Sequence, residues 1–548
     1  MTKIHSAYSR LTFITLLLAV TGGAIAPTSA QHRLQPSQRQ FSLSPPATAA
    51  GQSTNAPKTL AELRARIEEV MRRPELAPGM FAVKVASLDT GQILFSENAD
   101  KLLRPASNMK IYTVAAALDR LTTDYRFVTS VYAGEKPDKS GTIKGNLIIY
   151  GRGDPSIAAR FNNGDYTKGI NDLADRIVAA GVKRVKGDLV GDESYFNGPP
   201  LGGGWEWEDL QWWYGAEVSA LTINDNALDL FVKPGSKVGA PCLITTGPPA
   251  PFVSISNRTR TSPAGGKSEL TVYRALGSNV LEIGGNLPLD NKGYAGFVAV
   301  PDPALVFASM LRASLAQRGV AFTGRTRTVN GRSTPSLVQT QNNLAAQPAD
   351  AKASSSQPLL EIASLQSPPL NIIAAQTLKP SQNLYTELIL RTLGKGPGAN
   401  PKQTSEQAGL EVVKGFLQQA GVNSDELVLS DGSGLSRNDM ITASASLQLL
   451  TYMSRHRYAD VFREALPIAG VDGTLSNRMK NTPAMGNVRA KTGTLSSVAS
   501  LSGYVTTAAG ERLVFSMMLN NYADVSTVRK DSIDAIAVLL ASFAGRSQ

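Results

Sequence analysis

The chain has 548 residues, which at typical domain sizes is enough for about three or four domains and a large hydrophobic core. Hydrophobic residues make up 42% and charged residues 18%, a composition typical of a soluble globular protein and too apolar for a disordered one. The formal net charge is +11, but lysine and arginine are scattered rather than gathered in basic runs, which disfavours a nucleic-acid-binding protein.

Residues 1–30 are typical of a secretory signal peptide. Lys3 and Arg10 give a positive start, an apolar run follows at 11–26, and the small residues at 28–30 suit a cleavage site. This apolar run is shorter than the roughly 20 residues that a membrane-spanning helix needs. We therefore expect the folded part to lie outside the cytoplasm, in the periplasm or secreted. An uncleaved anchor and a peripheral membrane association remain as alternatives.

The folded part is expected to open with a helix, a hairpin and a second helix. It follows a flexible spacer at 31–58, which is rich in Gln, Ser, Pro and Ala. Apolar residues then recur at helical spacing over 60–73, and strand-like runs around a turn predict a β-hairpin over 81–95. Helical spacing returns at 107–121.

The middle of the chain differs in pattern from both ends. From about 128 to 330 short apolar runs are broken by Gly, Pro and Asn and are mostly strand-like, and a second low-complexity stretch, 333–358, is predicted to be a linker or surface loop. The later elements are expected as helices at 369–393, 404–420 and 441–465, strands at 487–495, 500–506 and 512–520, and a final helix at 525–543. A hairpin with a helix at one end and strands with a helix at the other predict one domain assembled from both ends, with the middle inserted.

Cysteine and histidine are too few for several kinds of site. Cys242 is the only cysteine, which excludes an intramolecular disulfide and a cysteine-based metal cluster. The three histidines are His5, His32 and His456, and of these His456 alone falls in the predicted folded part, between two arginines that suggest a surface position. A multi-histidine zinc site is therefore excluded and a Ser-His-Asp hydrolase disfavoured. Nucleophilic catalysis would need a base other than histidine.

Ser107 and Lys110 form the only Ser-x-x-Lys sequence in the chain and open a predicted helix. One helical turn separates them, so their side chains share a face, and the helix N-terminus offers backbone N–H groups that suit an oxyanion. A neutral lysine can take the serine proton if burial or a nearby cation lowers its pKa. The structural alternative is a capping serine followed by a surface lysine.

The sequence Lys-Thr-Gly-Thr at 491–494 is also unique and lies in a predicted strand directly before a hairpin. Gly493 would let a substrate approach the strand backbone, Lys491 offers a cation, and Thr492 can bind a carboxylate. The structural alternative is a tight strand end.

A Ser-x-Asn element would complete the motif set of serine β-lactamases and penicillin-binding proteins. Four matches begin at Ser53, Ser96, Ser381 and Ser436. The first lies in the spacer and the second ends a hairpin strand, so both are set aside. Spacing alone does not choose between Ser381, between two helical stretches, and Ser436, in a turn-rich loop.

The four tryptophans fall within nine residues, at 205, 207, 212 and 213, beside Asp209 and Tyr214. Such a cluster predicts either an aromatic wall near the side chain of a substrate or an aromatic core between domains.

In these motifs the chain resembles the class C low-molecular-mass penicillin-binding proteins, the penicillin-binding protein 4 type of D-Ala-D-Ala carboxypeptidases and endopeptidases. The resemblance runs over roughly residues 60–545 in the family's order. The stretches that carry it are YGRGDPS at 150–156, GDLVGDES at 187–194, SALTINDN at 219–226, SPPL at 367–370, SQNLY at 381–385, DGSGLSR at 431–437, GVDGTL at 470–475 and KTGTL at 491–495. By this resemblance Ser381 and Asn383 inherit the role of the second motif, with Gln382 in place of the usual Asp.

The resemblance implies an α+β fold. Its main domain would be of the serine transpeptidase/β-lactamase type, an antiparallel sheet flanked by helices, built from residues 59–127 and 359–548. Two β-rich domains would be inserted at 128–358, the second within the first at roughly 220–295.

The resemblance also implies a mechanism. Ser107 would attack the carbonyl between two D-alanines and form an acyl-enzyme that water later hydrolyses, with Lys110 as base and a neighbouring Lys491 lowering the pKa of Lys110. Ser381 would pass a proton to the leaving amine, and Asn383 would hold the network. The backbone N–H groups of Ser107 and Thr494 would form the oxyanion hole, and Thr492, Gly493 and Thr494 would lie at the substrate carboxylate. The residues implied for the substrate pocket are Asp209, Tyr214, Trp207, Arg437 and Leu495.

The expected partners are peptidoglycan stem peptides and, as covalent inhibitors, β-lactam antibiotics. No metal or organic cofactor and no nucleic acid is expected. A serine β-lactamase is the nearest alternative because it shares the acylating machinery, although the long insert and the unmatched deacylating Glu argue against it. A second alternative is a catalytically silent peptidoglycan-binding protein that uses the tryptophans and the positive charge.

Overall fold

The computed structural model describes residues 56–248, 253–331, 338, 359–396, 400, 402–523 and 530–548. The predicted signal peptide, nearly all of the first spacer and nearly all of 333–358 lie outside the described residues, and those interpretations stay predictions. Among the helices within the described ranges, none is both long and apolar enough to cross a membrane.

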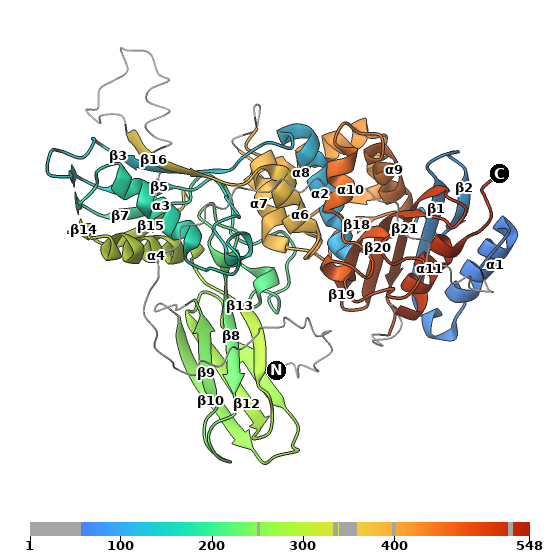
Figure 1. Ribbon diagram of the computed structural model, residues 1–548, viewed down its shortest axis with the longest axis horizontal. Helices are drawn as coiled ribbons and strands as arrows, with labels where there is room; N and C mark the ends of the chain where they lie inside the picture. Colours follow the sequence, from blue (N-terminus) through green and yellow to red (C-terminus); the bar gives the residue numbers. More distant parts are fainter. Residues whose placement is uncertain are drawn as a thin grey trace, which may run out of the picture.

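A five-stranded antiparallel sheet joins the two ends of the chain (Figure 1), and its order is β19-β20-β21-β1-β2. The strands are β1 (Met80–Ser87), β2 (Ile93–Glu97), β19 (Arg489–Leu495), β20 (Val498–Thr506) and β21 (Arg512–Asn520). The predicted hairpin and the three predicted C-terminal strands are confirmed. Because β1 pairs with β21 along its whole length, the first and last strands of the sequence form the middle of one layer.

Alternating residues of β1 point to two hydrophobic clusters, one on each face of the sheet. Val83 and Val85 pack with α1 (Leu60–Met71) and α11 (Ala535–Ser542), whereas Ala82 and Ala86 belong to the cluster around the other helices. Thr59 and Glu62 form a capping box at the start of α1, which fixes where this predicted helix begins.

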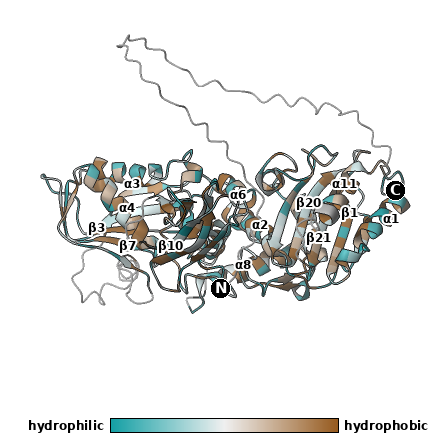
Figure 2. Cartoon of the chain, turned by 90° about the horizontal axis from the view of Figure 1, so that it is seen from below, coloured by the Kyte–Doolittle hydropathy of each residue, from teal (hydrophilic) through white to brown (hydrophobic). Residues whose placement is uncertain are grey.

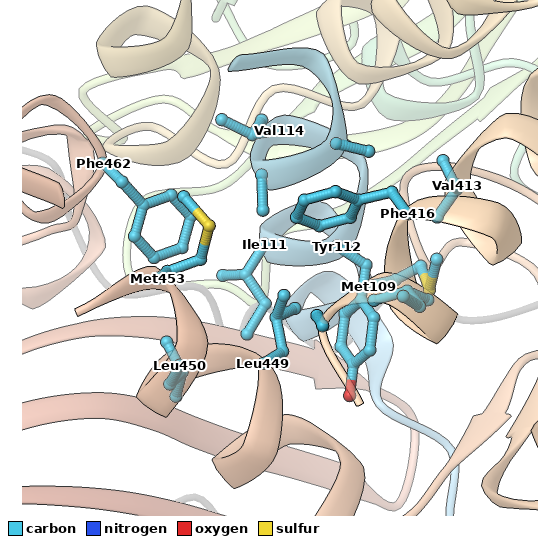
Figure 3. Close-up of a cluster of buried hydrophobic side chains, with 14 of the residues drawn as sticks. Met109, Ile111, Tyr112, Val114, Val413, Phe416, Leu449, Leu450, Met453 and Phe462 are labelled. Carbon is cyan, nitrogen blue, oxygen red and sulfur yellow. The ribbon is translucent and has the colours of Figure 1, made fainter. Parts of the chain in front are cut away.

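The helix α2 (Met109–Leu121) lies in the middle of the cluster that contains Ala82 and Ala86, and it is buried from Met109 to Leu118 (Figure 3). Apart from Lys110 and Thr113 these buried residues are hydrophobic, which suits a helix that is covered on all sides. The helices on this side of the sheet are α6 (Leu370–Leu378), α7 (Asn383–Leu393), α8 (Ser405–Gln419), α9 (Ala443–Met453) and α10 (Ala459–Ala465).

Between α2 and α6 the chain leaves the main domain and builds a second layered unit. A mixed five-stranded sheet has the order β15-β7-β5-β3-β16, and a smaller one has the order β14-β6-β4. The strands are β3 (Val128–Ala133), β4 (Thr142–Lys144), β5 (Leu147–Tyr150), β6 (Arg184–Lys186), β7 (Leu189–Asp192), β14 (Ala321–Phe322), β15 (Thr326–Val329) and β16 (Leu360–Gln366).

Two helices of this unit fall where the sequence was expected to be mostly strand. They are α3 (Lys168–Ala179), along which Figure 2 shows both hydrophilic and hydrophobic residues, and α4 (Pro303–Gln317). Their signals are present in the sequence. Ile170, Leu173 and Ile177 recur at helical spacing in α3, and Asp302 caps α4 with proline at its first position.

A third unit projects from the second one in Figure 1 and consists of two three-stranded sheets. Leu230 and Val232 of one sheet and Ile283 and Leu287 of the other belong to one buried cluster. The sheets have the orders β13-β8-β9 and β10-β12-β11, with β8 (Ala227–Lys233), β9 (Leu243–Gly247), β10 (Ser254–Ser262), β11 (Glu269–Tyr273), β12 (Val280–Pro288) and β13 (Tyr294–Ala299).

Candidate active site

Ser107 lies at the start of α2, in the short helix η2 (Ala106–Asn108) that leads into it. Ser107 is partly exposed, whereas Lys110, one turn later, is completely buried. The Lys110 Nζ donates a hydrogen bond to the Ser107 Oγ over 2.9 Å. The alternative of a surface lysine is therefore wrong, and the two side chains share one face as their spacing predicts.

Two glycines allow other segments to reach the backbone before Ser107. A Cβ at Gly434 would lie 1.9 Å from the Ala106 carbonyl oxygen, and a Cβ at Gly493 would lie 2.5 Å from the Pro105 carbonyl oxygen. Gly493 thus makes room for this turn, and the expectation that it also lets a substrate approach the strand stays a prediction. Ser500 on β20 adds a 2.7 Å hydrogen bond to the Pro105 carbonyl.

Lys110 is held by two further oxygen atoms besides the Ser107 hydroxyl. Its Nζ donates to the Asn383 Oδ1 over 2.6 Å and to the Ser433 carbonyl over 2.7 Å. These partners come from α7 and from the loop between β17 (Leu427–Val428) and β18 (Met440–Ile441). The lysine amine is thus fixed from three elements, and its lone pair in the neutral form can face the Ser107 proton.

Burial is the largest cause of the change in the pKa of Lys110, which falls to about 7. The nearby carboxyl groups of Asp431, Glu387 and Asp439 raise the pKa and oppose this effect. Removal from water, and not the charge of Lys491, is therefore the dominant cause of the low pKa of Lys110. The result is a lysine that exchanges its proton near neutral pH.

Lys491 is the second completely buried lysine of the site. From β19 its Nζ donates to the Ser381 Oγ over 2.8 Å and to the Thr492 carbonyl over 2.9 Å. Burial, with the charge of Lys110 as a second cause, lowers the pKa of Lys491 well below its usual range. The two lysines therefore lie close enough for the charge of one to disfavour the charge of the other.

The geometry separates the two open Ser-x-Asn candidates. Ser381 contacts Lys491 and Asn383 contacts Lys110, whereas Ser436 is buried in its own loop and accepts a hydrogen bond from the Asn438 backbone N–H. Ser381 has φ of 64°, a left-handed conformation that non-glycine residues adopt mostly where the surroundings enforce it. The structure thus brings the 381–383 element, and not Ser436, to the two lysines.

Gln382, the second residue of the 381–383 element, has a structural role. Gln382, which replaces the usual Asp, is completely buried, and its Oε1 accepts the Leu384 backbone N–H at the start of α7. Asn383 is oriented from the opposite side, because its Nδ2 donates to the Tyr214 carbonyl over 2.8 Å. A carbonyl only accepts, so it fixes the amide with Oδ1 toward Lys110.

The predicted pocket residues are only partly brought together. Arg437 pairs with Glu206 at 3.0 Å, a residue that the sequence did not single out, and its charge also acts on Asp209. Burial, aided by Glu206, raises the pKa of Asp209 to about 6. Tyr214 contributes through its carbonyl. The remaining predicted residues line β19: Thr492 shares a 2.7 Å hydrogen bond with Thr474, Gly493 packs on η2, Thr494 is exposed and Leu495 is half-buried.

The four tryptophans do not form one wall. Trp205 packs against a cluster that includes Leu384 and Leu388 of α7, and its Nε1 donates to Asp431 over 2.8 Å. Trp212 packs on the core of the second and third units, Trp213 lies edge-on to Tyr214, and Trp207 is 59% exposed. The core interpretation is therefore correct for Trp205 and Trp212.

Two contributors were missed by sequence reasoning. They are the Ser433 carbonyl, which holds Lys110, and the Asp431 carboxylate behind it. Their stretch, 431–437, was noticed, and its two glycines around a serine are the signal that predicts a tight loop. Within the described ranges no group of three or more His, Cys, Asp or Glu is placed to hold a metal ion.

Comparison with known proteins agrees with this geometry. The D-Ala-D-Ala carboxypeptidase 3 (S13) family matches residues 63–543. A D-alanyl-D-alanine carboxypeptidase of Actinomadura sp. (strain R39) is 33% identical over 498 residues, which cover 89% of this chain and 86% of the relative. The D-alanyl-D-alanine carboxypeptidase DacB of Haemophilus influenzae is 28% identical, with 80% of this chain and 84% of the relative covered.

A solved structure shows the same architecture. The crystal structure of penicillin binding protein 4 (dacB) from Haemophilus influenzae superposes with a TM-score of 0.71 at 25% identity, and the match covers 85% of this chain and 98% of that one. The α+β fold expected from the resemblance is thereby confirmed.

Proposed function

Because the chain belongs to the D-Ala-D-Ala carboxypeptidase 3 (S13) family and is a serine-type D-Ala-D-Ala carboxypeptidase, we propose that Ser107 is its nucleophile and Lys110 the base. The observation that carries this proposal is the Lys110 amine, which is completely buried, 2.9 Å from the Ser107 Oγ, with a pKa of about 7. A general base works best when its pKa lies near the working pH.

In acylation, neutral Lys110 takes the proton of Ser107, and the Ser107 Oγ attacks the carbonyl carbon between the two D-alanines. The bond to the leaving D-alanine nitrogen then breaks. Ser381, held by Lys491, gives its proton to that nitrogen and regains one from Lys110. The net change moves the Ser107 proton to the leaving amine and leaves an ester on Ser107. Water releases the acyl group by the same steps in reverse order.

The substrate is proposed to lie along β19. The backbone N–H groups of Ser107 and Thr494 form the oxyanion hole, and Thr492 and Thr494 bind the terminal carboxylate. Support comes from the position of Gly493, which packs the strand against the Ser107 turn, and from the exposure of Thr494.

The remaining part of the pocket is proposed to bind the substrate side chain. Asp209 and Arg437 offer opposite charges there, and Trp207 and Leu495 offer partly exposed apolar surface. Peptide side chains that carry an amine and a carboxylate would fit such a pair of charges.

Peptidoglycan stem peptides are the proposed substrates, and action on their cross-links as an endopeptidase is proposed as well. β-Lactams are proposed to acylate Ser107, because they present a reactive acyl carbonyl to the same nucleophile. The name of the Haemophilus protein, a penicillin binding protein, supports this. We therefore propose that the enzyme acts outside the cytoplasm, in accord with the signal-like sequence at 1–30.

Labelling with a fluorescent penicillin tests the proposal. Wild type should hold the label on a denaturing gel, Ser107→Ala should take up none, and Ser140→Ala, which removes an exposed hydroxyl of the second unit, should match wild type. D-Alanine release from a stem peptide should follow the same pattern.

Two other labelling results would each favour a different protein class. Wild type without label and without D-alanine release would overturn the proposal and favour the silent wall-binding protein. Label that appears and vanishes within minutes would favour the β-lactamase.

A further inference from the structure

The loop of residues 429–439, here called the Asp431 loop, is built around one buried carboxylate. Asp431 is completely buried. Five donors point at its oxygens: the Ser433 hydroxyl at 2.9 Å, the backbone N–H groups of Gly434 at 2.6 Å, Leu435 at 3.1 Å and Ser436 at 3.0 Å, and the Trp205 Nε1 at 2.8 Å. So many donors suit a carboxylate anion, which only accepts.

The Asp431 loop touches the proposed catalytic helix directly. The Ser433 carbonyl accepts a hydrogen bond from Lys110, and the Gly432 carbonyl accepts one from Thr113 over 2.9 Å, one turn further along α2. Among the charged groups that act on Lys110, Asp431 has the largest influence, and it favours the ammonium form. The shape and the charge of this loop therefore both bear on the base.

Four of the five donors belong to the loop itself, and the fifth comes from a different part of the chain. Trp205 lies in the segment between β7 and β8, outside the main domain. Gly202 and Gly204 make room for this contact: a Cβ at Gly202 would lie 2.4 Å from the indole nitrogen, and one at Gly204 would lie 2.5 Å from the Ser436 Oγ.

We propose that Trp205 is a positioning residue, whose indole N–H anchors Asp431 and so holds the Ser433 carbonyl on Lys110. The insert then takes part in the chemistry without touching the substrate. This inference rests on the proposed function, in which Lys110 is the base.

Removal of the indole N–H has a defined electrostatic consequence. The Asp431 anion would lose one of its compensating dipoles, and its stronger field would stabilise the ammonium form of Lys110. The acylation rate rises with pH as Lys110 loses its proton, and this rising part of the pH profile, the acid limb, would then move to higher pH. Replacement of Asp431 by a neutral residue should move the same limb to lower pH. The opposite signs distinguish this effect from a general loosening of the site.

The test is the pH profile of acylation by penicillin, measured in single turnover on the full chain. Trp205→Phe keeps an aromatic ring and should lower the acylation rate at pH 7 by roughly tenfold or more, which corresponds to the lower end of the energy of one hydrogen bond to a charged group. Its acid limb should shift upward, and apparent affinity for penicillin should change less than the rate. Trp212→Phe, which alters an indole in the core of the other units, should match wild type.

Asp431→Asn gives a second, independent readout if Trp205→Phe is too unstable to measure, and its acid limb should shift downward. Profiles of both variants that superpose on wild type would overturn the proposal, and so would shifts in the same direction. If Lys110→Met were acylated as fast as wild type, the proposed function itself would fail, which is a separate result.

Discussion

The site holds two completely buried lysines in different surroundings. Lys110 faces the Asp431 loop, where carboxyl groups offset part of the effect of burial and leave its pKa at about 7. Lys491 lies on β19 and donates to a hydroxyl and a carbonyl, and its pKa falls well below the usual range because of burial and the nearby Lys110. The two lysines are equally buried but differ in pKa, because carboxyl groups lie near Lys110.

Two groups whose pKa values are pushed apart can take separate parts in acid–base chemistry. Lys110 can gain and lose a proton near neutral pH. Lys491 favours the neutral amine in the free protein, but a substrate carboxylate beside it would raise its pKa, since an opposite charge favours the ammonium form. We therefore infer that Lys110 transfers the proton, whereas Lys491 holds Ser381 and responds to the anionic end of the substrate.

The largest expected effect comes from removing each lysine in turn. Lys110→Met should lower the rate of acylation by penicillin at least about a thousandfold, because it removes the general base. Lys491→Met should cost less, about a hundredfold, because Ser107 keeps its base. Single-turnover labelling measures both, with thermal unfolding as the control for folding. A larger loss in Lys491→Met than in Lys110→Met would reverse the assignment.

Sequence reasoning found the parts of this site that are local. Ser107 and Lys110 share a helical turn, and the Lys-Thr-Gly strand carries its own signature, so short spacing was enough to identify both. The choice of Ser381 over Ser436 was different, since both triplets have the same residue types. Spacing does not separate them, the family resemblance favoured Ser381, and the contacts of Ser381 with Lys491 and of Asn383 with Lys110 agree with that choice.

The contributors that were missed act through backbone or over long sequence distance. The Ser433 and Tyr214 carbonyls hold Lys110 and Asn383, but a carbonyl is present at every residue and leaves no mark in the sequence. His456 was expected on the surface because of its two arginine neighbours. Its side chain is instead largely buried and lies 3.1 Å from Asp119 near the end of α2, a partner that local sequence does not reveal.

The fold was predictable to a similar degree. Both ends of the chain were correctly predicted to contain the strands that meet in one sheet, because their apolar patterns are long and regular. The helices α3 and α4 were overlooked because the glycines and prolines around them dominate the pattern. Their caps and helical spacing were nevertheless present.

A smaller effect is expected when a charge is added on the Lys110 side. Asn383→Asp places a carboxylate where the amide oxygen lies 2.6 Å from the Lys110 Nζ, and it removes the donor to the Tyr214 carbonyl. The added anion should raise the pKa of Lys110 from about 7 by about one unit, so the neutral fraction and the acylation rate at pH 7 should fall about fivefold. The rate should recover as the pH approaches 9.

Asn438→Asp is the matched control, because it adds the same charge on the exposed side of the Asp431 loop. Water screens that position, and its pH profile should follow wild type. An Asn383→Asp profile without an upward shift would show that the pKa of Lys110 does not respond to its nearest side-chain oxygen.

The smallest effect is expected at Glu387, and it tests which carboxyl groups carry charge. Glu387 is completely buried, and its Oε1 accepts the Gly432 backbone N–H over 3.0 Å. Burial, with nearby Asp431 as a second cause, raises the pKa of Glu387 well above its usual range, which favours its neutral form and weakens the effect of its charge on Lys110. Glu387→Gln keeps the acceptor for Gly432 and should leave the acid limb of acylation within about 0.2 pH units of wild type, because it replaces one neutral group by another. A downward shift as large as that of Asp431→Asn would mean that Glu387 is charged in the folded protein. The difference in pKa between Lys110 and Lys491 would then depend on the charges of both Glu387 and Asp431.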